Sequence, residues 1–152
     1  MKGKRCAILF LAFFTALSGC SQGEGKAVAG NMNEAAAVSH DDGEEREKAE
    51  QMKEAALSMK EMKNVCLVKG KKQTVLAFQV YHRHRFRMEK IQKDLSEEMK
   101  KRFPDEKITV SYDFKIFLET SRLIHKIRSG KISGEKAEKE IGRIVRLNNE
   151  KT

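Results

Sequence analysis

The sequence predicts an α+β fold: a small αββαβ domain whose three-stranded sheet has helices packed on one face, followed by two C-terminal helices. Three observations predict this fold. Apolar residues recur every three or four positions in four segments, as they do on amphipathic helices. They alternate or run together in three short segments, as they do in strands. Turn-forming residues separate these segments, most clearly over residues 69–72.

The first three elements are expected to be a helix and a β-hairpin. The helix covers residues 46–63, where one face carries Ala49, Met52, Ala56 and Met59. The apolar run 65–68 predicts a buried strand, and 74–81 predicts a second strand whose two faces are Leu76, Phe78 and Val80 against Val75, Ala77, Gln79 and Tyr81. Between them, Gly70 is expected to adopt a positive φ in the turn.

The second half of the domain adds one strand and three helices. A helix is expected over residues 85–102, and Pro104 ends it. Alternating apolar residues predict a strand over 108–112. A helix over 114–129 follows, with Gly130 suited to the position just after its end. The last helix covers 135–148, and Ser133 is suited to cap its N-terminus.

The N-terminus has the pattern of a lipoprotein signal peptide. Basic residues at positions 2, 4 and 5 precede an apolar run over 6–17, which is shorter than the roughly twenty residues that span a bilayer. The run ends in Leu17-Ser18-Gly19-Cys20, which resembles a lipobox. Residues 1–19 are therefore expected to be a signal peptide, and Cys20 the lipidated first residue of an exported protein anchored to the outer face of a cell or spore membrane. An ordinary cleaved signal or an uncleaved anchor is the alternative.

Charge divides the rest of the chain into an acidic leader and a basic domain. The whole chain has a net charge of +9, residues 21–45 contribute −5, and residues 46–152 contribute +11. The leader is rich in small and polar residues and has no aromatic residue, so it is predicted to be a flexible tether over residues 20–45. A random coil of that length reaches roughly 25–30 Å. Residues 46–152 are enough for one domain.

Cys66 is expected to be a buried apolar residue. Of the three cysteines, Cys6 leaves with the signal peptide and Cys20 carries lipid, so Cys66 has no intrachain disulfide partner. Its neighbours Val65, Leu67 and Val68 favour burial. A reactive thiol is the alternative.

The strongest functional feature is an excess of basic residues. Residues 66–103 carry eleven Lys or Arg and four Asp or Glu. The proposed binding residues fall in two groups, one at the hairpin tip and one after the second strand: Lys69, Lys71 and Lys72, and Arg83, Arg85 and Arg87. Export argues against a nucleic-acid partner, so the expected partners are the membrane itself, an anionic envelope polymer or an envelope protein. A surface that only keeps the domain soluble is the alternative.

The sequence gives little support for catalysis. His82 and His84 lie two positions apart and could begin a metal site, but no third ligand is evident, and their arginine neighbours favour a solvated basic surface. Ser133 and Lys136 match a Ser-x-x-Lys pattern without its accompanying motifs. We expect no catalytic residue, no metal and no cofactor. A small wall-active or metal-dependent enzyme remains the alternative.

Several stretches resemble the YhcN/YlaJ family of sporulation lipoproteins from endospore-forming Gram-positive bacteria. They are the lipobox, the low-complexity leader, residues 59–70 (MKEMKNVCLVKG), the strand 75–80, Arg102-Phe103-Pro104 and the strand 108–112. The Asn-rich leader and the Asn-Pro-Asp-Phe stretch of some members are missing. The resemblance implies a spore membrane or envelope setting, a role in germination or outgrowth, and no established enzymatic activity.

The order of elements also resembles BON domains and ring-building motifs. This is a likeness of fold, and it carries no function by itself. It implies a sheet whose second face or free edge is open to a partner. The expected function is that of a membrane-anchored, non-enzymatic binding or assembly module.

Overall fold

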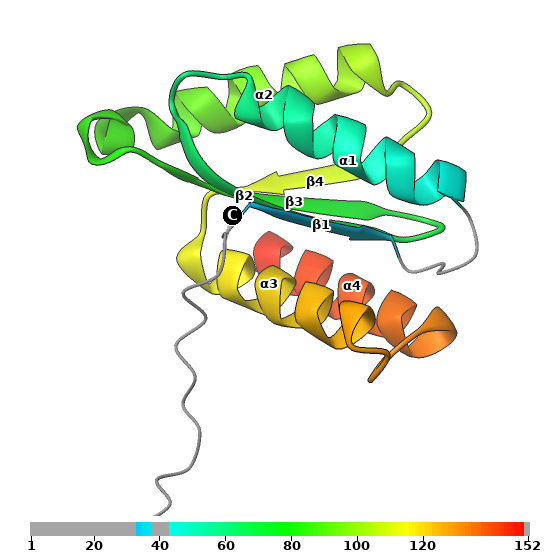
Figure 1. Cartoon of the computed structure of the whole chain (residues 1–152). Helices are drawn as coiled ribbons and strands as arrows, with labels where there is room; N and C mark the ends of the chain where they lie inside the picture. Colours follow the sequence, from blue (N-terminus) through cyan, green and yellow to red (C-terminus); the bar gives the residue numbers. More distant parts are fainter. Residues whose placement is uncertain (1–32, 38–42, 151–152) are drawn as a thin grey trace, which may run out of the picture.

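The computed structural model describes residues 33–37 and 43–150. These residues form three layers, with one sheet between two pairs of helices (Figure 1). Helices α1 and α2 cover one face of the sheet, and α3 and α4 cover the other. The elements, in chain order, are β1 (Glu34–Ala37), α1 (Gly43–Leu57), β2 (Met62–Lys69), β3 (Thr74–Val80), the 3₁₀ helix η1 (His82–Arg87), α2 (Met88–Arg102), β4 (Ile108–Ser111), α3 (Phe114–Arg128) and α4 (Gly134–Asn149).

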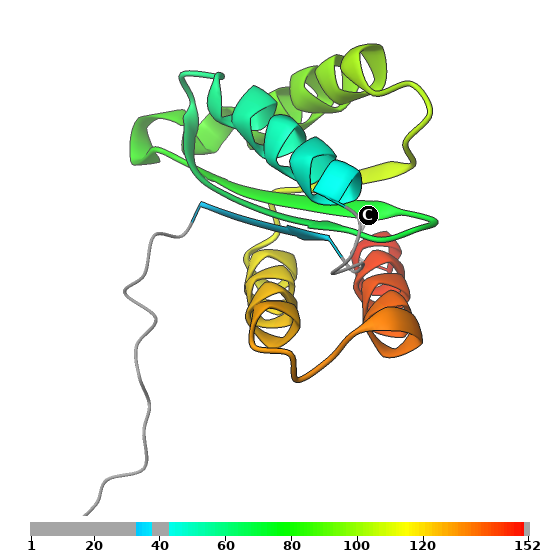
Figure 2. The same cartoon turned by 45° about the vertical axis from the view of Figure 1, so that its right-hand side comes forward.

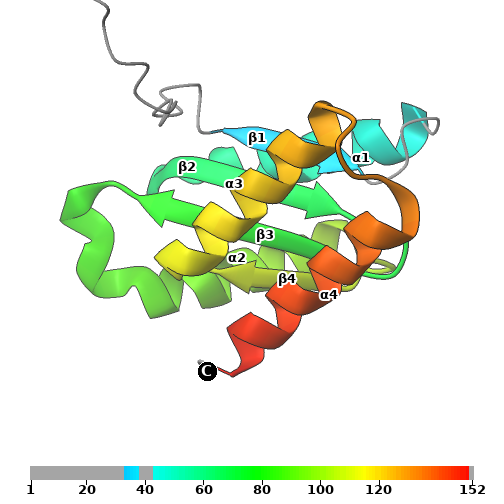
Figure 3. The same cartoon turned by 90° about the horizontal axis from the view of Figure 1, so that it is seen from below.

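The sheet has four strands in the order β1-β2-β3-β4, which is also their order along the chain (Figure 3). β2 and β3 form the expected antiparallel hairpin, with Leu67 opposite Leu76. β1 runs parallel to β2, and β4 runs parallel to β3. The α+β class, the αββαβ order and the two C-terminal helices are therefore as predicted, and the sheet gains a fourth strand ahead of them.

That fourth strand corrects one prediction. Glu34–Ala37 was expected to belong to a flexible tether, but it pairs with Cys66–Lys69 at the edge of the sheet. Just before it, Asn33 Oδ1 accepts a hydrogen bond from the backbone N–H of Val65 at 2.8 Å. The backbone of β1 pairs with the edge of β2, whose N–H and C=O groups would otherwise lack hydrogen-bond partners in the sheet. Composition could not reveal this strand, because it forms by pairing with a segment about thirty residues further along the chain.

The hairpin lies between the two pairs of helices (Figure 2). It separates two hydrophobic cores. On one face, Val65, Leu67, Leu76 and Phe78 pack with α1 and α2. On the other face, residues from the same strands pack with α3 and α4, namely Cys66, Val68, Val75 and Ala77. A strand buried on both faces has a continuous apolar sequence, which explains the run at 65–68. The face opposite α1 and α2 is therefore covered, and the expectation that it is open to a partner is wrong.

Several element boundaries differ from the prediction: α1 begins at Gly43 and α2 at Met88, rather than at residues 46 and 85. α1 ends at Leu57 instead of continuing to residue 63, and β2 begins at Met62 with an irregular register before Asn64. The hydroxyl of Ser58 donates to the carbonyl of Ala55 at 2.7 Å, which helps to close the last turn. Apolar periodicity alone does not mark this end, because Met59 and Met62 are both apolar and both face the first core.

The turn after α3 forms as predicted around Gly130. This residue has φ +68°, its N–H donates to the carbonyl of Ile127, and the N–H of Lys131 donates to the carbonyl of Lys126. These two bonds define a Schellman motif. Ser133 takes the N-cap position of α4, but its side chain makes no capping hydrogen bond.

Gly70 serves a different purpose from the one predicted. Its φ is not positive, since Gly130 and Gly134 are the positive-φ glycines of the described residues. A Cβ at Gly70 would lie 2.8–2.9 Å from the carboxylate of Glu138 and 2.9 Å from Cδ1 of Ile141. A side chain at this position would therefore require the side chains of Glu138 and Ile141 on α4 to shift.

Candidate functional site

The site is centred on η1, a single short 3₁₀ helix with the sequence His-Arg-His-Arg-Phe-Arg. It joins the end of β3 to the start of α2, so it projects from one end of the sheet (Figure 1). None of its residues is buried. Phe86 is 91% exposed, which is unusual for an aromatic side chain. The structure thus places Arg83, Arg85 and Arg87 together on one exposed segment, as the sequence predicts.

These three arginines have no acidic partner among the described residues, since none of the ion pairs there includes them. Two of them, Arg83 and Arg85, contact histidines and aromatic rings instead. Arg83 Nε donates to Nε2 of His84 at 2.9 Å, and Arg85 Nη1 lies 3.1 Å from Nε2 of His82. The two guanidinium carbons lie 5.5 Å and 5.6 Å from the ring centroids of Tyr81 and Phe86. The segment therefore keeps its positive charge available to an external anion.

A groove of about 730 Å³ adjoins η1. His82 and Arg85 contribute to one wall, and residues before and at the start of α3 contribute to the other, including Tyr112 and Phe114. Phe114 is 61% exposed, although it is the first residue of a helix that buries other large apolar residues such as Ile116 and Phe117. Arg85 and Phe114 therefore line the same groove, and Phe86 follows Arg85 in η1.

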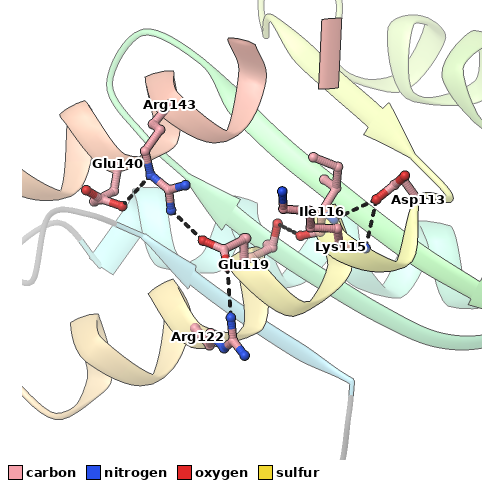
Figure 4. Close-up of polar contacts among 8 residues, drawn as sticks. Asp113, Lys115, Ile116, Glu119, Arg122, Glu140 and Arg143 are labelled. Carbon is pink, nitrogen blue, oxygen red and sulfur yellow. Dashed lines mark hydrogen bonds and ion pairs between the residues drawn. The ribbon is translucent and has the colours of Figure 1, made fainter. Parts of the chain in front are cut away.

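The sequence did not identify Phe86 and Phe114 as site residues. Phe86 lies within a run of basic residues and fits no apolar periodicity. This isolated position was the sequence signal that could have identified it as an exposed aromatic residue. Phe114 follows Asp113, whose carboxylate caps α3 by accepting from the N–H groups of Lys115 and Ile116 at 2.7 Å and 3.1 Å (Figure 4). The cap fixes where α3 begins, and this leaves Phe114 at the groove.

The prediction that Lys69 belongs to a binding surface is wrong. It is only 3% exposed, and its ammonium group lies 2.8 Å from carboxylate oxygens of both Glu45 and Glu106. Burial lowers the pKa of Lys69, but the hydrogen bonds and charges of the two glutamates outweigh it, so the pKa lies above its ordinary value. Lys69 therefore stabilises the fold by joining β2 to α1 and to the segment before β4.

Lys71 and Lys72 remain exposed at the hairpin tip. The backbone N–H of Lys71 donates to Oε1 of Glu138 on α4 at 2.6 Å, so an acidic side chain already lies beside this tip. The tip and η1 lie at opposite ends of the β2–β3 hairpin (Figures 1 and 3). The two basic groups are therefore separate. At the tip Lys69 is paired with Glu45 and Glu106, whereas no ion pair among the described residues includes the arginines of η1.

The histidine pair does not form a metal site with other described residues. Within residues 33–37 and 43–150, no group of three or more His, Cys, Asp or Glu is placed to hold a metal ion. The Nε2 atoms of His82 and His84 face guanidinium groups instead. Ser133 and Lys136 are both exposed at the start of α4.

The carboxylate and arginine groups between α3 and α4 are explained by packing of the two helices (Figure 4). Arg143 on α4 bridges Glu119 on α3 and Glu140 on its own helix, and Arg122 also binds Glu119 at 2.9 Å. The hydrogen bond from Arg143 is the main reason that the pKa of Glu119 lies below its ordinary value. These ion pairs link the helices at the surface.

Cys66 lies in the second core and is completely buried. Burial, together with the charge of Glu34, raises the pKa of its thiol to about 12, so the thiol is protonated and unreactive at neutral pH. We expect Cys66→Ala to lower the free energy of unfolding by about 1 kcal/mol and to leave binding to anionic ligands unchanged. Urea denaturation and a binding assay check this. Loss of binding by a fully folded variant would instead support the reactive thiol.

Comparison with protein-family models, with curated proteins and with solved structures gives no significant match. In the part of the chain that the structure describes, no helix combines the length and the apolar character needed to cross a bilayer.

Proposed function

We propose that this protein is a membrane-anchored lipoprotein of the spore or cell envelope that works as a non-enzymatic binding module. The lipobox at Cys20, which lies outside the described residues, supports anchoring. The resemblance to sporulation lipoproteins supports a role in germination or outgrowth.

One observation carries the binding part of the proposal: η1 exposes three arginines that have no acidic partner among the described residues. A surface that only maintains solubility usually mixes charges of both signs. Ion pairs of this mixed kind occur elsewhere on the domain, for example between Lys90 and Asp94 at 2.8 Å. The anions outside a Gram-positive membrane are lipid headgroups and envelope polymers, and η1 has the charge to attract them.

Anchoring is tested at Cys20. The variant Cys20→Ala should lose labelling by a diacylglyceryl precursor and should no longer partition with membranes as mature protein, because two acyl chains are needed for stable anchoring. The measurement is metabolic labelling with a fatty-acid analogue, followed by fractionation. Labelling that persists in this variant would contradict the assignment of the lipobox.

Binding is tested by its dependence on salt. The chain from Ser21 to Thr152, once circular dichroism has confirmed that it is folded, should bind immobilised poly(glycerol phosphate) at low ionic strength. Binding should decline steeply above about 0.1 M salt, where the screening length is about 10 Å. No binding at low salt would contradict the proposal, and binding that is insensitive to salt would contradict its electrostatic basis.

A further inference from the structure

We propose that the ligand of η1 is an anionic lipid bilayer and that Phe86 and Phe114 insert into its interfacial region. The inference rests on the proposed binding function and names the partner. It joins three observations: the exposed aromatic side chains, the arginines that form no ion pair with other described residues, and the direction from which the chain enters the sheet.

The first observation concerns the aromatic side chains. Among the large apolar residues of the described part of the chain, Tyr81, Phe86 and Phe114 are exposed, at 46%, 91% and 61%. Tyr81 and Phe86 belong to or adjoin η1, and Phe114 lines the groove that η1 borders. Their exposed surface is costly in water and favourable in the headgroup region of a membrane, where aromatic rings are enriched. A soluble anionic polymer offers no comparable apolar phase.

The second observation concerns charge. Phe86 lies between Arg85 and Arg87, so a ring that enters the interface brings two guanidinium groups to the level of the phosphates. Each Arg or Lys near an anionic surface contributes about 1 kcal/mol of attraction. Because these arginines form no ion pair among the described residues, approach to a membrane breaks no salt bridge. Charge and apolar surface therefore favour the same partner.

The third observation concerns the direction of β1. β1 runs parallel to β2, with Glu34 opposite Cys66 and Ala37 opposite Lys69, which lies next to the hairpin tip. The chain therefore enters β1 from the side of the sheet where η1 lies (Figures 1 and 3). From Cys20 to Glu34 the chain spans at most about 50 Å when fully extended. An anchor at Cys20 therefore leaves the η1 end of the domain within reach of the membrane.

The test uses the absence of tryptophan from this sequence. The variant Phe86→Trp introduces one indole as a reporter at a site exposed enough to accept it. The full acylated chain is reconstituted on vesicles of phosphatidylglycerol and on vesicles of phosphatidylcholine. Emission wavelength and quenching by brominated lipid chains are then measured on both. Ser129→Trp, at an exposed position between α3 and α4 on the opposite end of the domain, is the matched control.

The proposal predicts that the indole of Phe86→Trp shifts its emission to shorter wavelength and is quenched on phosphatidylglycerol, and that both effects are several-fold weaker on phosphatidylcholine. Combining Phe86→Trp with Arg83→Glu, Arg85→Glu and Arg87→Glu should abolish them. The Ser129→Trp control should remain in water on both vesicles. None of these substitutions changes a residue of either core, so the variants should stay folded.

Other outcomes would overturn the inference. An indole at position 86 that stays in water on anionic vesicles excludes insertion. If the same protein still binds poly(glycerol phosphate) in a salt-dependent way, the proposed binding function stands and only its bilayer partner is wrong. If it binds neither, both proposals fail. Equal quenching of the Phe86→Trp and Ser129→Trp indoles would show adsorption without orientation, which also contradicts the inference.

Discussion

Lys69→Ala is expected to lower the free energy of unfolding by about 3 kcal/mol, the largest loss from any polar substitution considered for this domain. Lys69 is buried, and its ammonium group lies 2.8–2.9 Å from both carboxylate oxygens of Glu106. Removing it leaves Glu106 largely buried with Lys48, at 3.3 Å, as its remaining partner. Glu45 is more exposed and can turn toward water. The measurement is urea denaturation followed by circular dichroism.

A double-mutant comparison separates charge from packing. Lys69→Met keeps most of the aliphatic stem and should still be strongly destabilising, because the carboxylate of Glu106 remains. Adding Glu106→Gln should recover much of that loss, since the uncompensated charge is then gone. If Lys69→Met alone is as stable as the natural protein, the ion-pair explanation is wrong.

The same network predicts a pH dependence. Burial raises the pKa of Glu106, but Lys69 and Lys48 outweigh it, so the pKa lies below the ordinary value of 4.5. The stabilisation by Glu106 is therefore present above that value and is lost as pH falls through the lower, folded-state pKa. The raised pKa of Lys69 keeps its contribution present below 10.5 and loses it at still higher pH. The difference in stability between the natural protein and Lys69→Ala should be constant between these values and should shrink in acid.

Much of the fold could be predicted because its elements differ in periodicity. The hairpin could be placed from Val65–Val68 and from the alternation around Leu76 and Phe78, and both predictions are confirmed by the two cores. Gly130 could be placed because a helix end that needs positive φ favours glycine. These features depend on local sequence, and local sequence was sufficient to find them.

Other features depend on contacts between distant segments, and local sequence patterns do not reveal such contacts. β1 forms by pairing with the edge of β2, and Gly70 lies close to the side chains of Glu138 and Ile141 because α4 packs against the turn. Lys69 is part of a basic run in sequence, but Glu45 and Glu106 come to it from segments far along the chain. The arginines of the candidate site were predicted, whereas Phe86 and Phe114 became visible only through their exposure.

The second large effect is expected from reversing the charge of η1. Changing Arg83, Arg85 and Arg87 to Glu removes three cations and adds three anions at the same place, so at about 1 kcal/mol per charge the affinity for an anionic surface should fall at least about 100-fold. Stability should change little, because the three side chains are exposed and form no ion pair within residues 33–37 and 43–150. Replacing His82 and His84 with Ala should have a much smaller effect on binding.

The most direct measurement compares this variant with a matched one that has the same net charge. Lys126, Lys131 and Lys136 are exposed and lie around the turn between α3 and α4, at the other end of the domain. Both triple variants, made in the chain from Ser21 to Thr152, are titrated with phosphatidylglycerol vesicles at fixed salt. Our account predicts near-complete loss of binding for the reversal at η1 and a loss of only a few-fold for the reversal of the three lysines. Equal losses in the two variants would mean that net charge alone drives binding and would contradict a localised site at η1.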